Sequence, residues 1–230
     1  MKFKKDLIHG RLIRRYKRFL ADVLLDDGAQ VTAHCTNSGS MKSCLEEGAE
    51  VWLSPVDDPN RKTQFTWEMI SIGGGWVGIN TSNPNALAFE WISNGIIPGL
   101  DGFTELKREV KWEDSRFDLY GEAPDRSCFI EVKNVTLKEG ERALFPDAVT
   151  ERGRKHLHTL IRVKQSGMRA VMLYVVQRMD VEIFSAAREI DPAYAETLDE
   201  AVCKGVEVMV AQAKVSPEGI TFYRMLPLDL

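Results

Sequence analysis

The sequence has few cysteines and no pattern that pairs them. Its four cysteines are scattered without a Cys-x-x-Cys pair, and its four histidines do not complete a zinc-ligand spacing with them. Neither a disulfide scaffold nor a structural zinc site is therefore expected. The cysteines are interpreted as buried thiols of a protein in a reducing cytosol.

Long apolar segments are also missing. The charged N-terminus is not followed by an apolar core of signal-peptide length, and the run near residues 170–176 is too short to cross a bilayer. No internal repeat or low-complexity segment is evident. We therefore expect a cytoplasmic protein without a membrane partner, and the sequence leaves a homodimer open.

The charge is unevenly distributed along the 230 residues. The net charge of −4 argues weakly against nucleic acid, but the first 20 residues hold eight cationic side chains and only one acidic one, Asp6. Such asymmetry is typical of a phosphate-binding surface, and the alternative is an exposed basic pair of strands. The candidate DNA-contacting residues there are Lys4, Arg11, Arg14, Arg15, Lys17 and Arg18.

Residues 1–81 are predicted to form an OB-like all-β barrel. Strands are expected at 7–16, 19–25, 29–35, 51–56, 64–72 and 76–80, with a short helical turn at 41–46. Five or six short strands with one helical turn suit a small barrel of the oligonucleotide-binding type. Its aromatic residues could stack on bases, although such residues more often lie in a core. They are Tyr16, Phe19, Trp52, Phe65 and Trp67.

Residues 82–230 are predicted to form a mixed α/β domain. A helix from about residue 85, with Asn83 as N-cap and Pro84 in its first turn, is followed by strands at 105–112, 116–122 and 128–135. The remaining expected elements are a loop at 137–150, a helix at 151–166, a buried strand at 170–177, a short strand at 181–184, a helix from Asp191 to about 213, and a strand at 219–226.

Two acidic residues and a lysine stand out in this second half. Glu131 and Lys133 alternate within the apolar strand 128–135, so they project to the same face, and Asp118 on the preceding strand can lie opposite them. Two carboxylates held together repel unless a cation joins them. Carboxylate oxygens favour a hard ion such as Mg²⁺ or Mn²⁺. The alternative is an ordinary salt bridge between Glu131 and Lys133.

Basic residues also gather at the start of the expected helix 151–166, where Arg152 comes first. Cations at a helix N-terminus oppose the helix dipole, so a phosphate site would account for them. Arg152 is therefore a further candidate DNA contact. The alternative is an ordinary solvated surface.

Several short stretches together resemble one known family, and the resemblance covers nearly the whole chain. Asp118, followed by Glu131-Val132-Lys133, resembles the core of the PD-(D/E)XK nuclease superfamily. More closely, the chain resembles the sugar fermentation stimulation protein family. The matching stretches are Asn37–Met41, Asn83–Glu90, Gly95–Pro98, Ser115–Asp118, Glu131–Val135, Phe145–Ala148 and Thr150–Gly153.

The resemblance implies an oligonucleotide-binding barrel, a nuclease-like domain, DNA binding and a role in regulating sugar catabolism. It implies that Asp118 and Glu131 are metal ligands and that Lys133 is the catalytic-type lysine. Residue 117 is phenylalanine rather than the proline of the superfamily motif, a departure that the superfamily tolerates.

The resemblance also implies catalytic residues on the two helices that flank the sheet. Glu90 matches the carboxylate on the superfamily's first helix. Either Lys155 or His156, on the second helix, would face the same site.

Three functions follow as hypotheses. The first is a DNA-binding protein with a nuclease-like site, the second is an active Mg²⁺- or Mn²⁺-dependent nuclease, and the third is a metabolite-responsive regulator. The residues themselves reveal no sugar pocket, so the third hypothesis depends on the family's name alone.

Overall fold

The first six strands curl into a small barrel. In the computed structural model, which describes residues 1–230, they are β1 (Ile8–Tyr16), β2 (Leu20–Leu25), β3 (Gln30–His34), β4 (Glu50–Pro55), β5 (Phe65–Ile72) and β6 (Gly75–Gly78). They pair in the order β3-β2-β1-β4-β5-β6, and a parallel pairing of β3 with β5 closes the sheet. Alternate side chains such as Leu12, Val23 and Trp67 fill its interior. The expected OB-like barrel is confirmed.

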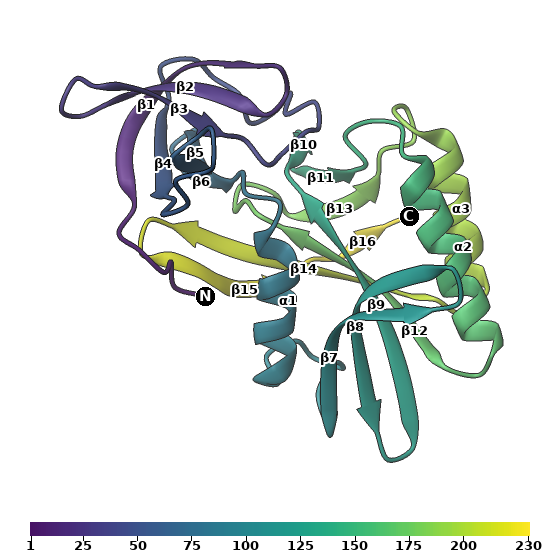
Figure 1. Cartoon of the computed structure of the whole chain (residues 1–230). Helices are drawn as coiled ribbons and strands as arrows, with labels where there is room; N and C mark the ends of the chain where they lie inside the picture. Colours follow the sequence, from purple (N-terminus) through teal and green to yellow (C-terminus); the bar gives the residue numbers. More distant parts are fainter.

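A six-stranded mixed sheet forms the centre of the second unit (Figure 1). Its order is β15 (Gly219–Met225), β14 (Glu207–Ser216), β12 (Arg169–Val176), β9 (Arg126–Val135), β8 (Ser115–Ala123) and β7 (Glu105–Trp112). Helix α1 (Asn83–Ser93) covers one face, and α2 (Glu151–Gln165) and α3 (Pro192–Cys203) cover the other. The expected mixed α/β fold is confirmed.

The three central strands are parallel because helices connect them. β9 pairs in parallel with β12, and β12 in parallel with β14, with α2 and α3 as the crossovers. Seven of the eight residues of β12 are buried, as predicted for an apolar strand covered on both faces. This arrangement places the start of α2 near the end of β9.

The predicted helix from Asp191 to about residue 213 is wrong in its second half. Asp191 does cap α3 by accepting from the Tyr194 N–H, but the helix ends at Cys203. Gly205 then adopts a φ of 86°, in the left-handed region that ends many helices. The following segment is strand β14, whose register is set by its pairing with β12 rather than by local sequence.

The predicted loop at 137–150 is also partly wrong. It contains β10 (Leu137–Glu139) and β11 (Arg142–Phe145), which join β13 (Ile183–Ala186) and β16 (Leu228–Asp229) in a small sheet of order β10-β11-β13-β16. The segment at 41–46 forms turns without a helix. Strands this short are stabilised by their neighbours, which local sequence does not reveal.

The N-cap of α1 differs from the prediction as well. The cap is Ser82, which makes no side-chain cap bond, and Asn83 is the first helical residue. The amide of Asn83 instead donates to the buried carboxylate of Glu68 on β5 at 3.1 Å. Glu68 also accepts from Ser54 and Asn80, so this carboxylate joins the barrel to α1.

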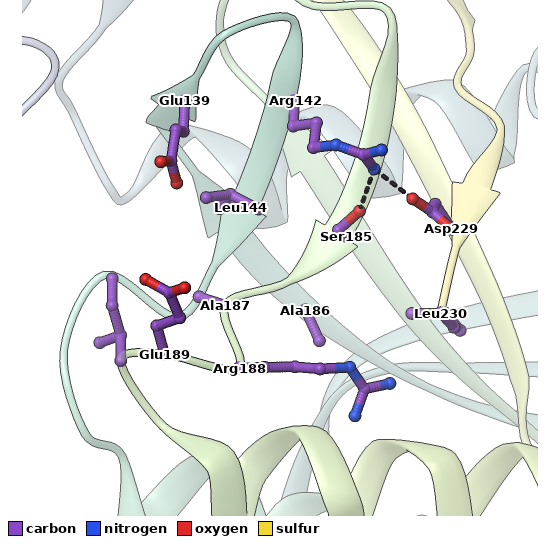
Figure 2. A pocket seen from close by; sticks show the side chains of 11 residues that line it. Glu139, Arg142, Leu144, Ser185, Ala186, Ala187, Arg188, Glu189, Asp229 and Leu230 are labelled. Carbon is purple, nitrogen blue, oxygen red and sulfur yellow. Dashed lines mark hydrogen bonds and ion pairs between the residues drawn. The ribbon is translucent and has the colours of Figure 1, made fainter.

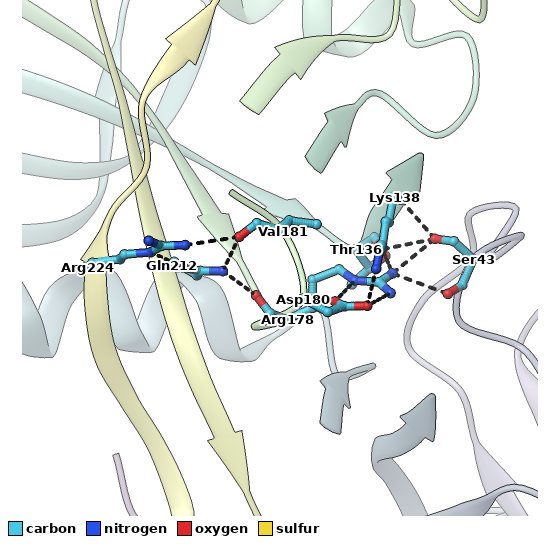
Figure 3. A network of polar contacts seen from close by, with 8 residues as sticks. All are labelled: Ser43, Thr136, Lys138, Arg178, Asp180, Val181, Gln212 and Arg224. Atoms are coloured by element: carbon cyan, nitrogen blue, oxygen red, sulfur yellow. Dashed lines mark hydrogen bonds and ion pairs between the residues drawn. The ribbon is translucent and has the colours of Figure 1, made fainter. Parts of the chain in front are cut away.

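A buried arginine forms a second junction between the barrel and the α/β unit (Figure 3). The Arg178 side chain is 1% exposed and donates to the Thr136 carbonyl at 2.7 Å and to the Ser43 hydroxyl at 3.1 Å. Ser43 belongs to the barrel, whereas Thr136 follows β9. Asp180 balances the charge through two bonds of 2.7 and 2.9 Å. The two units are therefore held in one relative orientation.

None of the three helices is both long enough and apolar enough to cross a membrane.

We predict that Arg178→Met lowers the free energy of unfolding by about 3 kcal/mol, because it removes the buried donor to the Ser43 and Thr136 oxygens and leaves Asp180 with Lys138 as its remaining cation. Arg188→Met is the control. Arg188 also pairs with an aspartate, Asp199, but both side chains are largely exposed, so the loss should stay below about 1 kcal/mol. Urea denaturation measures both values, and similar losses in the two variants would contradict the junction's importance.

Candidate functional site

Strand β8 separates from β9 at Asp118. The paired register runs from Ala123 opposite Arg126 to Leu119 opposite Ile130 and then stops. Beyond that point the Val132 N–H donates to Asp118 Oδ2 at 2.8 Å instead of to a strand carbonyl. The other carboxylate oxygen accepts from the Asn85 amide of α1 at 2.6 Å. Asp118 thus lies where β8, β9 and α1 meet.

Glu131, Lys133 and His156 form a compact cluster next to this point. Lys133 Nζ lies 2.6 Å from Glu131 Oε1 and 3.2 Å from His156 Nδ1, and His156 Nδ1 also contacts Glu131. The Glu131 side chain is 3% exposed. Strand alternation turns both β9 residues toward α2, which carries His156. The structure therefore brings together the β9 pair and one of the two α2 candidates.

The pKa values of the two carboxylates are shifted in opposite directions. Burial and the nearby charge of Glu131 raise the pKa of Asp118 to about 6. Burial also acts to raise the pKa of Glu131, but the hydrogen bond from His156 and the charge of Lys133 outweigh it and hold that pKa below its usual range. Glu131 is thus held by Lys133 and His156, whereas the hydrogen-bond donors to Asp118, the Asn85 amide and the Val132 N–H, are neutral.

Asp118 and Glu131 are oxygen donors of the type that a hard divalent cation prefers. The structure has no group of three or more His, Cys, Asp and Glu side chains that could hold a metal ion. Mg²⁺ usually takes one or two carboxylates, with waters or phosphate oxygens completing its shell. Asp118 and Glu131 could supply those carboxylates, and a cation there would relieve the repulsion that raises the Asp118 pKa.

Two predicted site residues, Glu90 and Lys155, make their contacts away from the cluster of Glu131, Lys133 and His156. The Glu90 carboxylate accepts from the Met1 amino group at 2.6 Å, beside the Ile220 carbonyl of β15. Lys155 forms an ion pair of 2.8 Å with Asp114 in the β7–β8 turn. Neighbouring helical residues point about 100° apart, so α2 can direct only one of Lys155 and His156 into the cluster. The contacts of Glu90 and Lys155 therefore do not support a role beside Asp118.

Most of the predicted cations on β1 already have partners. Arg11 pairs with Glu50, and Arg14 pairs with Asp22 at 3.0 Å. Arg15 donates to the carbonyls of Arg18, Asn37 and Gly39 at 2.8 to 3.0 Å, so it braces two barrel loops. Their use as DNA contacts stays a prediction.

A cleft of about 580 Å³ opens between the barrel and the α/β unit, and Lys133 lines it. Arg18 of the β1–β2 turn and residues 36–39 form the barrel side, and residues 144–150 with Arg152 form the opposite side. Arg152 also contacts His156, at 3.4 Å. The cleft therefore brings two of the predicted DNA-contacting arginines to the edge of the acidic cluster.

The remaining predicted cations lie outside this cleft. Lys17 is exposed in the same turn as Arg18 but does not line the cleft. Lys4 lines a separate hollow of about 660 Å³ with Lys2, Lys5 and Arg61. Of the five barrel aromatics considered for stacking, Phe19 is the one that is half exposed, whereas Trp67 is fully buried.

Sequence reasoning missed the contacts that shape this region. Asn85 hydrogen-bonds Asp118, and the signal available was its place in the Asn-Pro-Asn start of α1. Gly39 lies against Asp147, since a Cβ at Gly39 would come within 2.0 Å of that carboxylate. The adjacent Ser40 N–H donates to Asp147 at 2.9 Å. This glycine lets the barrel loop approach the α/β unit closely.

A different pocket, of about 430 Å³, lies in the small sheet beside α3 (Figure 2). None of the predicted site residues lines it. Its two arginines are already paired, Arg142 with Asp229 and with Ser185 at 2.9 Å, and Arg188 with Asp199. It offers no free cation to an anionic ligand.

Comparisons with known proteins agree over nearly the whole chain. Family models match at residues 13–79, described as "SfsA N-terminal OB domain", and at residues 82–219, described as "Sugar fermentation stimulation protein RE domain". Proteins named "Sugar fermentation stimulation protein homolog" are 52% identical in Pelobacter propionicus, covering 97% of this chain and 98% of the relative, and 51% identical in Geobacter metallireducens, covering 100% of both.

A solved structure is also similar throughout. It is described as "The structure of Pyrococcus Furiosus SfsA in complex with Ca2+" and matches with a TM-score of 0.90 at 26% identity. The match covers 100% of this chain and 98% of that one.

We predict that Asp118→Asn stabilises the protein at neutral pH. The folded state keeps a proton on Asp118 up to a pKa of about 6, whereas the unfolded chain loses it at about pH 4, so wild-type stability falls as pH rises through this window. Asparagine does not ionise, so the variant should be more stable above pH 6 by about 1 to 2 kcal/mol, a value reduced for partial solvent screening.

Urea denaturation in EDTA from pH 4.5 to 8 measures this difference. Asp114→Asn is the control, because Asp114 is exposed and its pKa is lowered by Lys155. This control variant should be no more stable than wild type at pH 8. Equal stability of wild type and Asp118→Asn at pH 8 would contradict the prediction.

Proposed function

Because this chain belongs to the sugar fermentation stimulation protein family, we propose that it is a DNA-binding protein with a divalent-metal site at Asp118 and Glu131. The observation that carries the proposal is the cleft in which Arg18 and Arg152 flank Lys133 at the edge of the two carboxylates. The relatives are named for the stimulation of sugar fermentation, and the proposal includes a role for this binding in the regulation of sugar catabolism.

Charge supports DNA as the partner. Arg18 and Lys17 make no ion pair, so their charges are free to contact phosphate, and Arg152 contacts only the His156 ring among side chains. Phosphate contacts by such cations release counterions and provide most non-specific affinity for DNA. The cleft's one acidic residue, Asp147, is turned to the Ser40 N–H.

The Pyrococcus furiosus relative supports a metal site, because its structure was solved in complex with Ca²⁺. In this chain Asp118 and Glu131 would hold Mg²⁺ or Mn²⁺, and the cation would polarise a phosphodiester as a Lewis acid. Lys133 would then place its ammonium beside the same phosphate and stabilise negative charge as it develops there. His156 contacts the same Glu131 oxygen as Lys133 and so helps to orient that carboxylate.

The second candidate function is nuclease activity, and the buried charge cluster favours it. Buried charges without full compensation destabilise a protein, and residues with perturbed pKa values are found most often at functional sites. A raised Asp118 pKa beside a lysine held by Glu131 matches that pattern. The metabolite-regulator hypothesis gains no support, because Arg142 of the separate pocket is already paired with Asp229 (Figure 2) and Arg188 with Asp199.

We predict that duplex DNA binds with an affinity that falls steeply as salt rises. The slope of log K against log salt should be about −0.9 for each phosphate contacted. The double variant Arg18→Gln/Arg152→Gln should weaken binding about tenfold at 100 mM salt and lower the slope by about 2 units. Fluorescence anisotropy from 50 to 300 mM NaCl measures both.

Lys155→Gln is the control for this charge change, because Lys155 pairs with Asp114 away from the cleft. It should bind as wild type does. Salt-independent binding, or no binding at 50 mM salt, would overturn the proposal.

We predict for the second candidate that wild type cuts plasmid or single-stranded DNA with Mn²⁺ or Mg²⁺. Asp118→Asn and Lys133→Met should each lower the rate by about 100-fold or more, because they remove a metal ligand and the stabilising charge. Both variants should keep DNA affinity within about threefold, since the arginines remain.

Gel analysis after a fixed time, with EDTA and Lys155→Gln as controls, separates the outcomes. Cleavage that survives both substitutions would point to a contaminating enzyme. Intact DNA with wild type and every metal would remove the nuclease hypothesis and leave DNA binding in place.

A further inference from the structure

We propose that the cleft between the two units takes an unpaired stretch of DNA, so that the preferred substrate carries a single-stranded end beside its duplex. This inference rests on the proposed DNA binding and specifies its substrate class. It follows from the size of the cleft, from the chemistry of its two walls and from the conformation of the Arg18 turn.

Size comes first. The cleft holds about 580 Å³, and pockets of about 300 to 1,000 Å³ enclose most of a drug-sized ligand, which is also the size of a nucleotide. A duplex has two backbones that flank grooves of about 12 and 6 Å, so it is larger than a cleft of this volume. A nucleotide must therefore leave its stack to reach Lys133 through this cleft, and an already unpaired nucleotide does so at the lowest cost.

The two walls differ in a way that suits a nucleotide. On one side the lining includes Phe145, which is partly buried, and Val149, which is 69% exposed. Such surface can cover the face of a base. Elsewhere in the lining, the Ser38 hydroxyl of the barrel makes no hydrogen bond within the protein, and the amide nitrogen of Asn134 on β9 is likewise without an acceptor. These groups can bond the polar edges of a base or its sugar.

Three cations line the same cleft. Arg18 lies on the barrel side, Lys133 in the cleft and Arg152 on α2, so successive phosphates of one strand can each meet a positive charge. A single strand follows such a basic groove with its bases turned against apolar surface. Asp147 is the acidic residue of the lining, and its carboxylate accepts from the Ser40 N–H.

The turn that carries Arg18 is built in a way that supports this use. Lys17 and Arg18 have φ values of 49° and 66°, the left-handed region that the tight turn of a hairpin requires. Asn-Gly fits such a turn with less strain than two long side chains do. Arg15 holds the turn by donating to the Arg18 carbonyl at 3.0 Å and to the Asn37 carbonyl at 2.8 Å. The turn thus presents Arg18 to the cleft from a braced position.

The experiment compares a blunt duplex with the same duplex carrying an eight-nucleotide single-stranded DNA tail, at one salt concentration, by fluorescence anisotropy. Wild type should bind the tailed DNA about tenfold more tightly. Val149→Glu adds a negative charge at the exposed rim of the cleft and should bring the ratio of the two affinities close to 1. Val202→Glu is its matched control, because Val202 is exposed on α3, away from the cleft.

A second pair of variants separates the cleft from general charge. Arg18→Gln should lower the preference for the tail by about fivefold, whereas Lys17→Gln, one residue away and outside the cleft, should weaken both DNAs equally and keep the ratio. A 2-aminopurine in the first unpaired position should change its fluorescence on binding to wild type and not to Val149→Glu.

The outcomes distinguish this inference from the proposed function. Equal, salt-sensitive affinity for blunt and tailed DNA would overturn the inference and leave DNA binding intact. No binding of either DNA at low salt would overturn both. An RNA tail that binds more tightly than the DNA tail would overturn the assignment to DNA, and a tail preference that Val149→Glu leaves unchanged would overturn the assignment to this cleft.

Discussion

The site depends on the electrostatic conflict between Asp118 and Glu131, two acids on adjoining strands in partly buried surroundings. Burial penalises both charges, and the charge of Glu131 adds to the cost of ionising Asp118. Lys133 and His156 compensate Glu131, whereas Asp118 keeps only an amide and a backbone N–H. Folding therefore retains an uncompensated acid at the place where β8 leaves β9, as expected where a function opposes stability.

The cleft depends on the fixed orientation of the barrel relative to the α/β unit. Arg178 and Glu68 are buried ionic groups that join the barrel to the second unit from two sides. Gly39 allows a third close approach, against Asp147. Buried polar contacts of this kind have directional requirements, so they specify one relative orientation where apolar contacts would tolerate several. Without that orientation Arg18 and Arg152 would not line the same space.

The elements that sequence predicted well are those whose pattern is local. Strong alternation and glycine turns identified the barrel strands, and a continuous apolar run identified β12. The errors have physical causes. Residues beyond Gly205 form β14 because β12 and β15 pair with them, and the short strands β10 and β11 form because β13 and its neighbours complete their sheet. Such pairing energy comes from distant residues and overrides local propensity.

Residues close together in the chain were enough to set the periodicities, the order of most elements and the alternation that turns Glu131 and Lys133 to one face. Folding in three dimensions was needed to select His156 rather than Lys155, to turn Glu90 to Met1, and to choose which arginines line the cleft. Those outcomes depend on helix rotation and on the docking of the two units. Both are set by contacts between residues far apart in sequence, which no local pattern contains.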